Sequence, residues 1–195
     1  MKRFVMTVAV SAAMLIPSVY AQTAGQDTTI SQRKENQQDR IANGVASGQL
    51  TAGETSRLES KEANLNSEIR TDRQANNGQL TAPEKAQINR QQNRLSGDIY
   101  NDKHNAAQQH YGNNEVDARR ENQQDRIAQG IRSGQMTAGE AARTEGQEAR
   151  INREVRTDRA ANGGHLTNNQ KAQVNRQLNK ESARIYNQKH NAAKR

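Results

Sequence analysis

The sequence predicts an all-α protein, built as a tandem duplication of an 86-residue unit with about three helices in each unit. One eight-residue phrase recurs four times, and it has the residue types that end one helix and begin the next. The two halves of the chain align without gaps at a constant offset of 86 residues. Apolar residues recur at helical spacing, and no stretch alternates as a strand would.

The duplication is clearest in two pairs of segments. KENQQDRIANG at 34–44 recurs as RENQQDRIAQG at 120–130, and IYNDKHNAA at 99–107 recurs as IYNQKHNAA at 185–193. Self-similarity at a fixed period indicates repeated structural units.

The chain begins with the pattern of an export signal. Lys2 and Arg3 precede an apolar run at 4–16, and small residues favour cleavage after Ala21. The apolar run is shorter than the ~20 residues that a membrane-spanning helix needs. We therefore expect a signal peptide at 1–21, no transmembrane segment after its cleavage, and a periplasmic or secreted protein.

These features predict five segments along the chain. They are a signal peptide at 1–21, a flexible N-terminus at 22–30, a first helical repeat unit at 31–108, a linker at 109–116 and a second helical repeat unit at 117–195.

The recurring phrase predicts four helix–turn–helix corners. It reads SGQLTAGE at 47–54, NGQLTAPE at 77–84, SGQMTAGE at 133–140 and GGHLTNNQ at 163–170. Its glycine suits the left-handed backbone just past a helix end. Its threonine can cap the next helix, while the Glu or Gln three residues later binds back to the threonine N–H, forming a capping box. The predicted helices are 31–46, 52–76, 82–107, 116–132, 138–162 and 168–192.

Each predicted helix of the first unit carries a narrow apolar stripe. The stripes are Ile41 with Val45, then Leu58, Leu65 and Ile69, then Ile88, Leu95 and Ile99. The second unit keeps the stripes imperfectly, since Thr144 stands at the place of Leu58 and Glu181 at that of Leu95. The apolar residue of each corner is expected to turn inward and close the end of the core. These residues are Leu50, Leu80, Met136 and Leu166.

The composition predicts a thin core. Only 31% of residues are hydrophobic, there is no Trp, and there is no Cys to form a disulfide. We therefore expect marginal stability or self-association as a homo-oligomer. Tyr100 and Tyr186 lie at the ends of apolar stripes, and we expect them to pack.

The sequence predicts no enzyme. It has no Cys nucleophile, no HExxH and no glycine-rich phosphate loop, and little apolar material to wall a catalytic pocket. His104 and His190 are equivalent, and each follows a lysine near the end of a long predicted helix, whose negative end they would complement. We expect no catalytic, cofactor-binding or metal-binding residue and no cofactor.

The segment RQANNGQLTAPE at 73–84 resembles the twelve-residue loop of an EF-hand. Its glycine falls at the sixth place, its leucine at the eighth and its glutamate at the twelfth. The resemblance extends to the four corners with their flanking helices, and implies helix–loop–helix pairs. Calcium ligands are needed at the first, third and fifth places. Those places hold Arg73, Ala75 and Asn77. The repeats are therefore EF-hand-like but degenerate, lacking calcium ligands.

The segment LTNNQ at 166–170 is similar to the LTxxQ motif of periplasmic Spy/CpxP-type proteins, and the other three corners carry Glu in place of the Gln. Members of that family are exported, basic and all-helical, and act as chaperones or envelope-stress modulators. This weaker resemblance implies a similar role here.

We expect an exported, non-enzymatic helical-repeat protein of the cell envelope that acts in interaction or scaffolding. The alternatives are a Spy/CpxP-like chaperone or stress protein and an EF-hand-like cation-responsive protein. The formal net charge of +8 favours a protein or an anionic envelope polymer as partner. Export, and the interleaving of basic with acidic residues, argue against nucleic acid.

Overall fold

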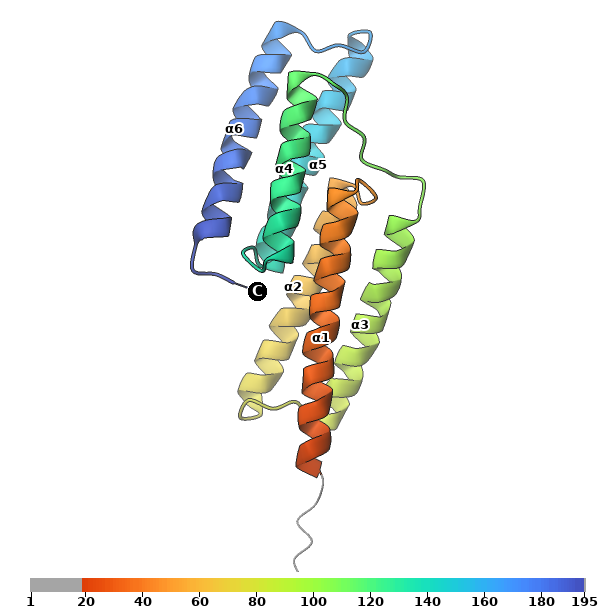
Figure 1. Cartoon of the computed structure of the whole chain (residues 1–195), viewed down its shortest axis with the longest axis vertical. Coiled ribbons are helices and arrows are strands. Elements are labelled where there is room, and N and C mark those ends of the chain that lie inside the picture. The colour runs from red at the N-terminus through yellow and green to blue at the C-terminus, as the bar shows by residue number, and fades with distance from the viewer. Residues whose placement is uncertain (1–18, 195) are drawn as a thin grey trace, which may run out of the picture.

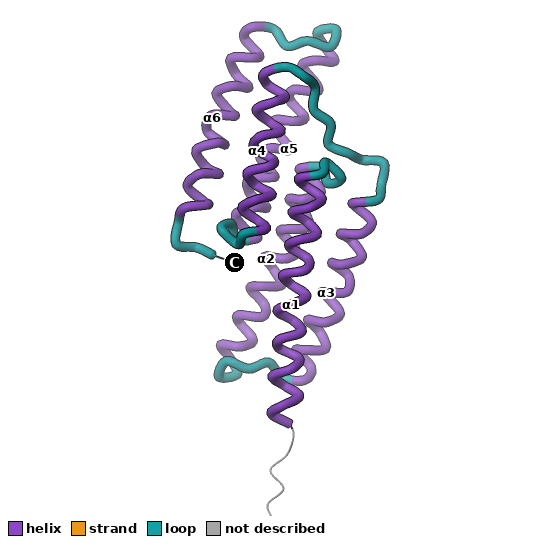
Figure 2. Tube along the Cα trace, in the orientation of Figure 1, coloured by secondary structure: helices purple, strands orange, loops and turns teal. Residues whose placement is uncertain are grey.

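The structure is a computed structural model that describes residues 19–194. Within that range the backbone forms six α-helices and no strand, so the all-α prediction is confirmed (Figures 1 and 2). The helices are α1 (Val19–Ala46), α2 (Ala52–Ala75), α3 (Ala82–Lys103), α4 (Glu115–Arg132), α5 (Ala138–Ala161) and α6 (Asn168–His190).

The first helix begins earlier than the sequence predicted. Residues 22–30, expected to be a flexible N-terminus, are helical and belong to α1. The physical reason is Ile30, which is buried in a cluster with Leu65 and Ile69 and extends the core toward the N-terminus. The carbonyl oxygen of Ile30 also accepts a 2.9 Å hydrogen bond from Gln92 Nε2. The predicted signal peptide lies, through residue 18, outside the described residues.

All four corners form the predicted capping boxes. In each corner the threonine N–H donates to the Glu or Gln side chain three residues later, at distances between 2.7 and 2.9 Å. The glycine of each phrase has the left-handed backbone that a helix end requires, as Gly48 shows with a φ of 69°. The recurring phrase is therefore explained by helix termination and initiation.

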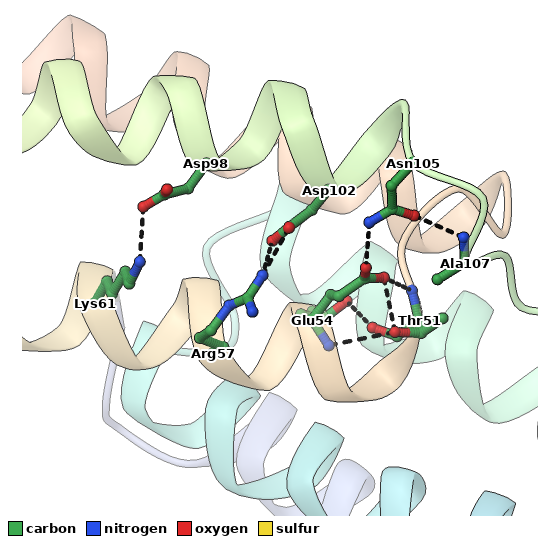
Figure 3. Close-up of polar contacts among 9 residues, drawn as sticks. Thr51, Glu54, Arg57, Lys61, Asp98, Asp102, Asn105 and Ala107 are labelled. Atoms are coloured by element: carbon green, nitrogen blue, oxygen red, sulfur yellow. Dashed lines mark hydrogen bonds and ion pairs between the residues drawn. The ribbon is translucent and has the colours of Figure 1, made fainter.

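Capping and inter-helix pairing are combined in the first unit (Figure 3). Glu54 uses one carboxylate oxygen in its capping box with Thr51, and the other accepts a 2.6 Å hydrogen bond from Asn105 Nδ2, just beyond α3. Further along α2, ion pairs join Arg57 to Asp102 and Lys61 to Asp98 on α3. The second unit has no counterpart to these two pairs, because the equivalent residues do not have matching charges. Those residues are Arg143 with Gln188 and Gln147 with Arg184.

Helices of the two units pack against each other at the centre of the molecule. α2 makes its most extensive contact with α5, and α1 with α4. In each pair the two helices run antiparallel, as the chain path shows (Figure 1). α3 packs on α1 and α2, while α6 packs on α4 and α5. The four central helices thus come equally from both units, and the third helix of each unit covers the outside.

The apolar core follows the same plan. A central cluster contains residues of both units, among them Ile41, Leu58, Ile127 and Ile185. A smaller cluster lies at each end of the molecule, one around Ile88 and one in the second unit. Every stripe residue predicted for the first unit is buried. Thr144, which stands at the place of Leu58, is also buried and donates a 2.6 Å hydrogen bond to Gln188.

The apolar residue of each corner turns inward, as predicted. Leu50 and Met136 are fully buried in the central cluster, and Leu80 and Leu166 are buried in the end clusters. Leu50 lies so close to Gly44 that a methyl group added there would approach its side chain to 2.6 Å.

No helix within residues 19–194 combines the length and the hydropathy that crossing a bilayer requires.

Candidate anion-binding grooves

The histidines and tyrosines singled out in the sequence lie at the ends of α3 and α6. Each histidine Nδ1 lies against a tyrosine carbonyl oxygen in the last turn of its helix, at 2.6 Å for His104 and 2.7 Å for His190. The expectation that Tyr100 and Tyr186 pack into the core is wrong, because they are 58% and 57% exposed. Their rings stack on the histidine rings instead, with centroids 4.2 and 4.1 Å apart.

The four corners serve as caps and core plugs. In residues 19–194 no three or more His, Asp and Glu side chains are grouped so that they could hold a metal ion. The one corner asparagine with a positive φ, Asn77, is exposed.

A groove of about 720 Å³ lies between α1 and α2, where the start of α5 and the C-terminal segment also reach its wall. We call it the α1–α2 groove. Its charged lining residues are Lys34, Arg70, Arg73 and Lys194, and among the described residues no Asp or Glu lines it. The apolar floor includes Ile30 and Ile69.

A second groove, of about 600 Å³, lies along α4 and α5 and is completed by the start of α2 and by residues 107–110. We call it the α4–α5 groove. Its ionisable lining residues are His110, Arg120, Arg153, Arg156 and Arg159, and again no described Asp or Glu lines it. The ionisable side chains that line the two grooves are therefore all basic.

The two grooves use equivalent positions of the two units. Arg70 and Arg73 of the first groove correspond, at the offset of 86, to Arg156 and Arg159 of the second. The start of α5 closes the first groove and the start of α2 closes the second. Each groove is thus built from both units, and it depends on the packing of α2 against α5.

Some arginines of the grooves are paired with an acidic side chain and others are not. Arg70 and Arg73 have no side-chain hydrogen bond or ion pair within the described residues, and the same holds for Arg153 and Arg156 of the other groove. A guanidinium presents five N–H donors in a fixed fork that matches carboxylate and phosphate oxygens. Four such groups facing solvent without partners can therefore bind anions.

In contrast, Arg120 and Arg159 form ion pairs with Asp117, which does not itself line the α4–α5 groove. Asp117 binds Arg120 at 2.7 Å and Arg159 at 2.9 Å, and its side chain is only 1% exposed. Burial alone would raise the pKa of Asp117, but the hydrogen bond and charge of Arg159, with the charge of Arg120, outweigh it and lower the pKa. In the first unit Ser31 stands at the place of Asp117, which leaves Arg73 unpaired.

α2 and α5 each carry two glutamates that are buried in the interior of the protein. Glu59 and Glu62 of α2, and Glu145 and Glu148 of α5, are all 0% exposed. Gln124 Nε2 donates a 3.1 Å hydrogen bond to Glu145, as Gln38 does at 3.0 Å to Glu59.

This burial raises the pKa of two of the carboxyl groups. Burial raises the pKa of Glu148 to about 8, with the charge of Glu181 adding to the rise and that of Arg120 opposing it. Burial also raises the pKa of Glu145 well above its ordinary value, against the hydrogen bond from Gln124. Both groups favour the neutral form, because ionisation in an apolar interior is costly.

In the sequence, arginines and acidic residues are interleaved along α2 and α5, which is typical of a solvated, charge-mixed helix face. The acids of that face have other partners in the structure, since Glu68 accepts hydrogen bonds from Gln87 and Gln91 of α3. A sequence signal for the grooves does exist. Arginines recur every third residue at 150, 153, 156 and 159, which places them along one side of a helix.

Comparisons with known proteins found no relative, since no family model, no curated protein and no solved structure matches the chain.

Proposed function

We propose that this is an exported, non-enzymatic protein of the cell envelope that binds an anionic polymer through the two grooves. The observation that carries the proposal is the set of unpartnered guanidinium groups, Arg70 and Arg73 in one groove and Arg153 and Arg156 in the other. The ligand class is a chain with repeated phosphate or carboxylate groups.

The spacing of the arginines supports a chain over a single small anion. Residues three apart on a helix are surface neighbours, with Cβ atoms about 5–6 Å apart. Arg70 and Arg73 are three apart, as are Arg153 and Arg156, so each pair can contact successive charges of one chain. The grooves are open and solvated, which makes the interaction modest in strength and sensitive to salt.

The surface is less suited to binding an unfolded client protein, as a chaperone would, than to binding a polyanion. Among the described residues, Tyr100 and Tyr186 are the only large hydrophobic side chains that are exposed. An apolar client needs a contiguous apolar patch, whereas a polyanion needs the unpaired arginines that are present. The LTxxQ-like segment is also accounted for by the capping box of Thr167 with Gln170.

The direct test is calorimetric titration with polyphosphate and with polygalacturonate, which separate phosphate from carboxylate recognition. The double variant Arg70→Gln with Arg156→Gln removes one unpaired arginine from each groove. Because an exposed charge pair contributes up to ~1 kcal/mol, we expect about fivefold weaker binding at each groove. Binding of the unmodified protein should also weaken steeply as salt rises from about 0.05 to 0.3 M.

The matched control is Arg90→Gln with Arg176→Gln. These arginines are exposed, occupy equivalent positions on α3 and α6, and line neither groove. The control lowers the net charge by the same two units, so it should bind almost as the unmodified protein does. If both double variants lost affinity equally, binding would depend on net charge alone, which would contradict the proposal.

A further inference from the structure

The two grooves lie on opposite edges of the molecule. The α1–α2 groove includes Lys194 of the C-terminal segment, and the α4–α5 groove includes residues 107–110 of the segment between α3 and α4. In Figure 1 the C-terminus lies left of α1 and α2 at mid-height, whereas the segment between α3 and α4 runs along the right edge. The segments that complete the two grooves therefore lie on opposite sides of the molecule.

We propose that each protein molecule binds two separate anionic chains at once and so cross-links them. This inference rests on the proposed function, because it takes the grooves to be binding sites for a polyanion. The new element is that the two grooves of one molecule bind different chains, so that the protein bridges them. A chain held in one groove would have to pass around the helical body to reach the other.

The fold holds the two sites at a fixed separation. Each groove takes its floor from one unit and an end wall from the other unit. Ser56 of α2 donates a 2.8 Å hydrogen bond to the carbonyl oxygen of Ala142 on α5, at the contact between the units. Gly146 lets the helices approach closely, since a Cβ there would lie 3.3 Å from Ser56 Oγ. The two grooves are therefore connected by a packed helical core and not by a flexible linker.

The size of each groove also fits one segment of a chain. Volumes of about 720 and 600 Å³ lie in the range that encloses a drug-sized molecule. A polymer would place only a few of its repeating units in each groove, and the rest of the chain would remain free to meet other copies of the protein. Repeated bridging of this kind builds a network when protein and polymer are present in comparable amounts.

The test uses polyphosphate of two lengths with the full protein, after sedimentation has established its size without ligand. A short polyphosphate of a few units should bind with a stoichiometry of two per protein. Long polyphosphate should produce large assemblies by light scattering, with a maximum at an intermediate ratio and re-dissolution when either component is in excess. Binding of long chains without such a maximum would overturn the inference.

Single-groove variants make the test specific. Arg70→Gln with Arg73→Gln impairs the α1–α2 groove, and Arg153→Gln with Arg156→Gln impairs the α4–α5 groove. Each should bind short polyphosphate at a stoichiometry of one and lose most of the scattering, while Arg90→Gln with Arg176→Gln should scatter as the unmodified protein does. Undiminished scattering by both single-groove variants would contradict bridging.

The outcomes separate this inference from the proposed function. Two short chains bound without cross-linking of long chains would leave the grooves as binding sites and remove only the bridging. One short chain bound per protein would leave only one binding site and would likewise remove the bridging. Absence of any heat with short and long polyphosphate and with polygalacturonate would remove both.

Discussion

Ser56 and Ala142 occupy equivalent positions in the two units, and the hydroxyl group of Ser56 donates a 2.8 Å hydrogen bond to the carbonyl oxygen of Ala142. The two halves of the chain therefore contact each other through equivalent positions, and α2 runs antiparallel to α5 (Figure 1). This contact explains why each groove includes residues of both units. Changes at the contact should affect both grooves together.

The first prediction concerns the corner leucine. In Gly44→Ala the new methyl group would lie 2.6 Å from Leu50 in a fully packed core. Overpacking of this kind costs ~1–3 kcal/mol, which should appear as a lower midpoint in denaturant unfolding. Gly130→Ala should behave alike, because its methyl group would lie 2.6 Å from Met136 Sδ.

Gly97→Ala is the matched control for these glycine variants. Gly97 lies in α3, and nothing comes within 4 Å of a Cβ added there. Since alanine favours a helix by about 1 kcal/mol over glycine, this variant should be slightly stabilised. Stabilisation of Gly44→Ala to the same extent would show that Leu50 does not plug the core as described.

The second prediction concerns pH. The pKa of Glu148 is about 8 in the folded protein, against an ordinary value of 4.5 that applies when the chain is unfolded. Between these values the folded state binds more protons, so the free energy of unfolding falls as pH rises from about 4.5 to about 8. Glu148→Gln should therefore reduce the slope of stability against pH and raise stability at pH 8.

Thermal melts at several pH values will measure this slope. Glu121→Gln, at an exposed position of α4, removes a carboxyl group that is not buried and should leave the slope unchanged. Part of the slope should remain in Glu148→Gln, because the pKa of Glu145 is also raised by burial. A slope identical to that of the unmodified protein would mean that Glu148 is not buried between the helices.

The third prediction concerns the buried ion pair. Asp117→Asn leaves Arg120, whose side chain is 5% exposed, without its carboxylate. Breaking a buried pair costs ~3–5 kcal/mol. Arg120 keeps its 2.8 Å hydrogen bond to Asn152 and its position 4.9 Å from the centre of the Tyr111 ring, so we expect the lower part of that range.

Asp98→Asn is the comparison for this variant, since it breaks the exposed pair with Lys61 and should cost no more than ~1 kcal/mol. The pKa of Asp117 is lowered on folding, so its contribution is present above the ordinary value of 3.8 and is lost as pH falls below it. Equal effects of the two asparagine variants in denaturant unfolding would contradict the burial of Asp117.

Much of the fold could be predicted because its signals are local. A glycine, a threonine and an acid within eight residues specify where one helix ends and the next begins, and Leu50 already marks the core side of its corner. The pairing of helices across units could not be predicted, because both units carry nearly the same apolar stripe and neither indicates its partner. The contact is made by small residues such as Ser56, Ala142 and Gly146, which carry no hydropathy signal.

The grooves were missed for a related reason. Arg70 and Arg73 lie near Glu68 and Asp72 in the sequence, a pattern that by itself is typical of a charge-mixed, solvated helix face. In the structure Glu68 turns to the glutamines of α3, so the arginines remain unpaired. Which carboxylate reaches which cation depends on the packing of neighbouring helices, and that packing is not visible in one helix alone.

Recognition of an anionic chain by the groove arginines can be measured most directly by NMR of the arginine Nε–Hε groups during titration with short polyphosphate. We expect the resonances of Arg70, Arg73, Arg153 and Arg156 to shift together, while those of Arg90 and Arg176 stay in place. Shifts spread evenly over all exposed arginines, or confined to residues outside the grooves, would contradict it.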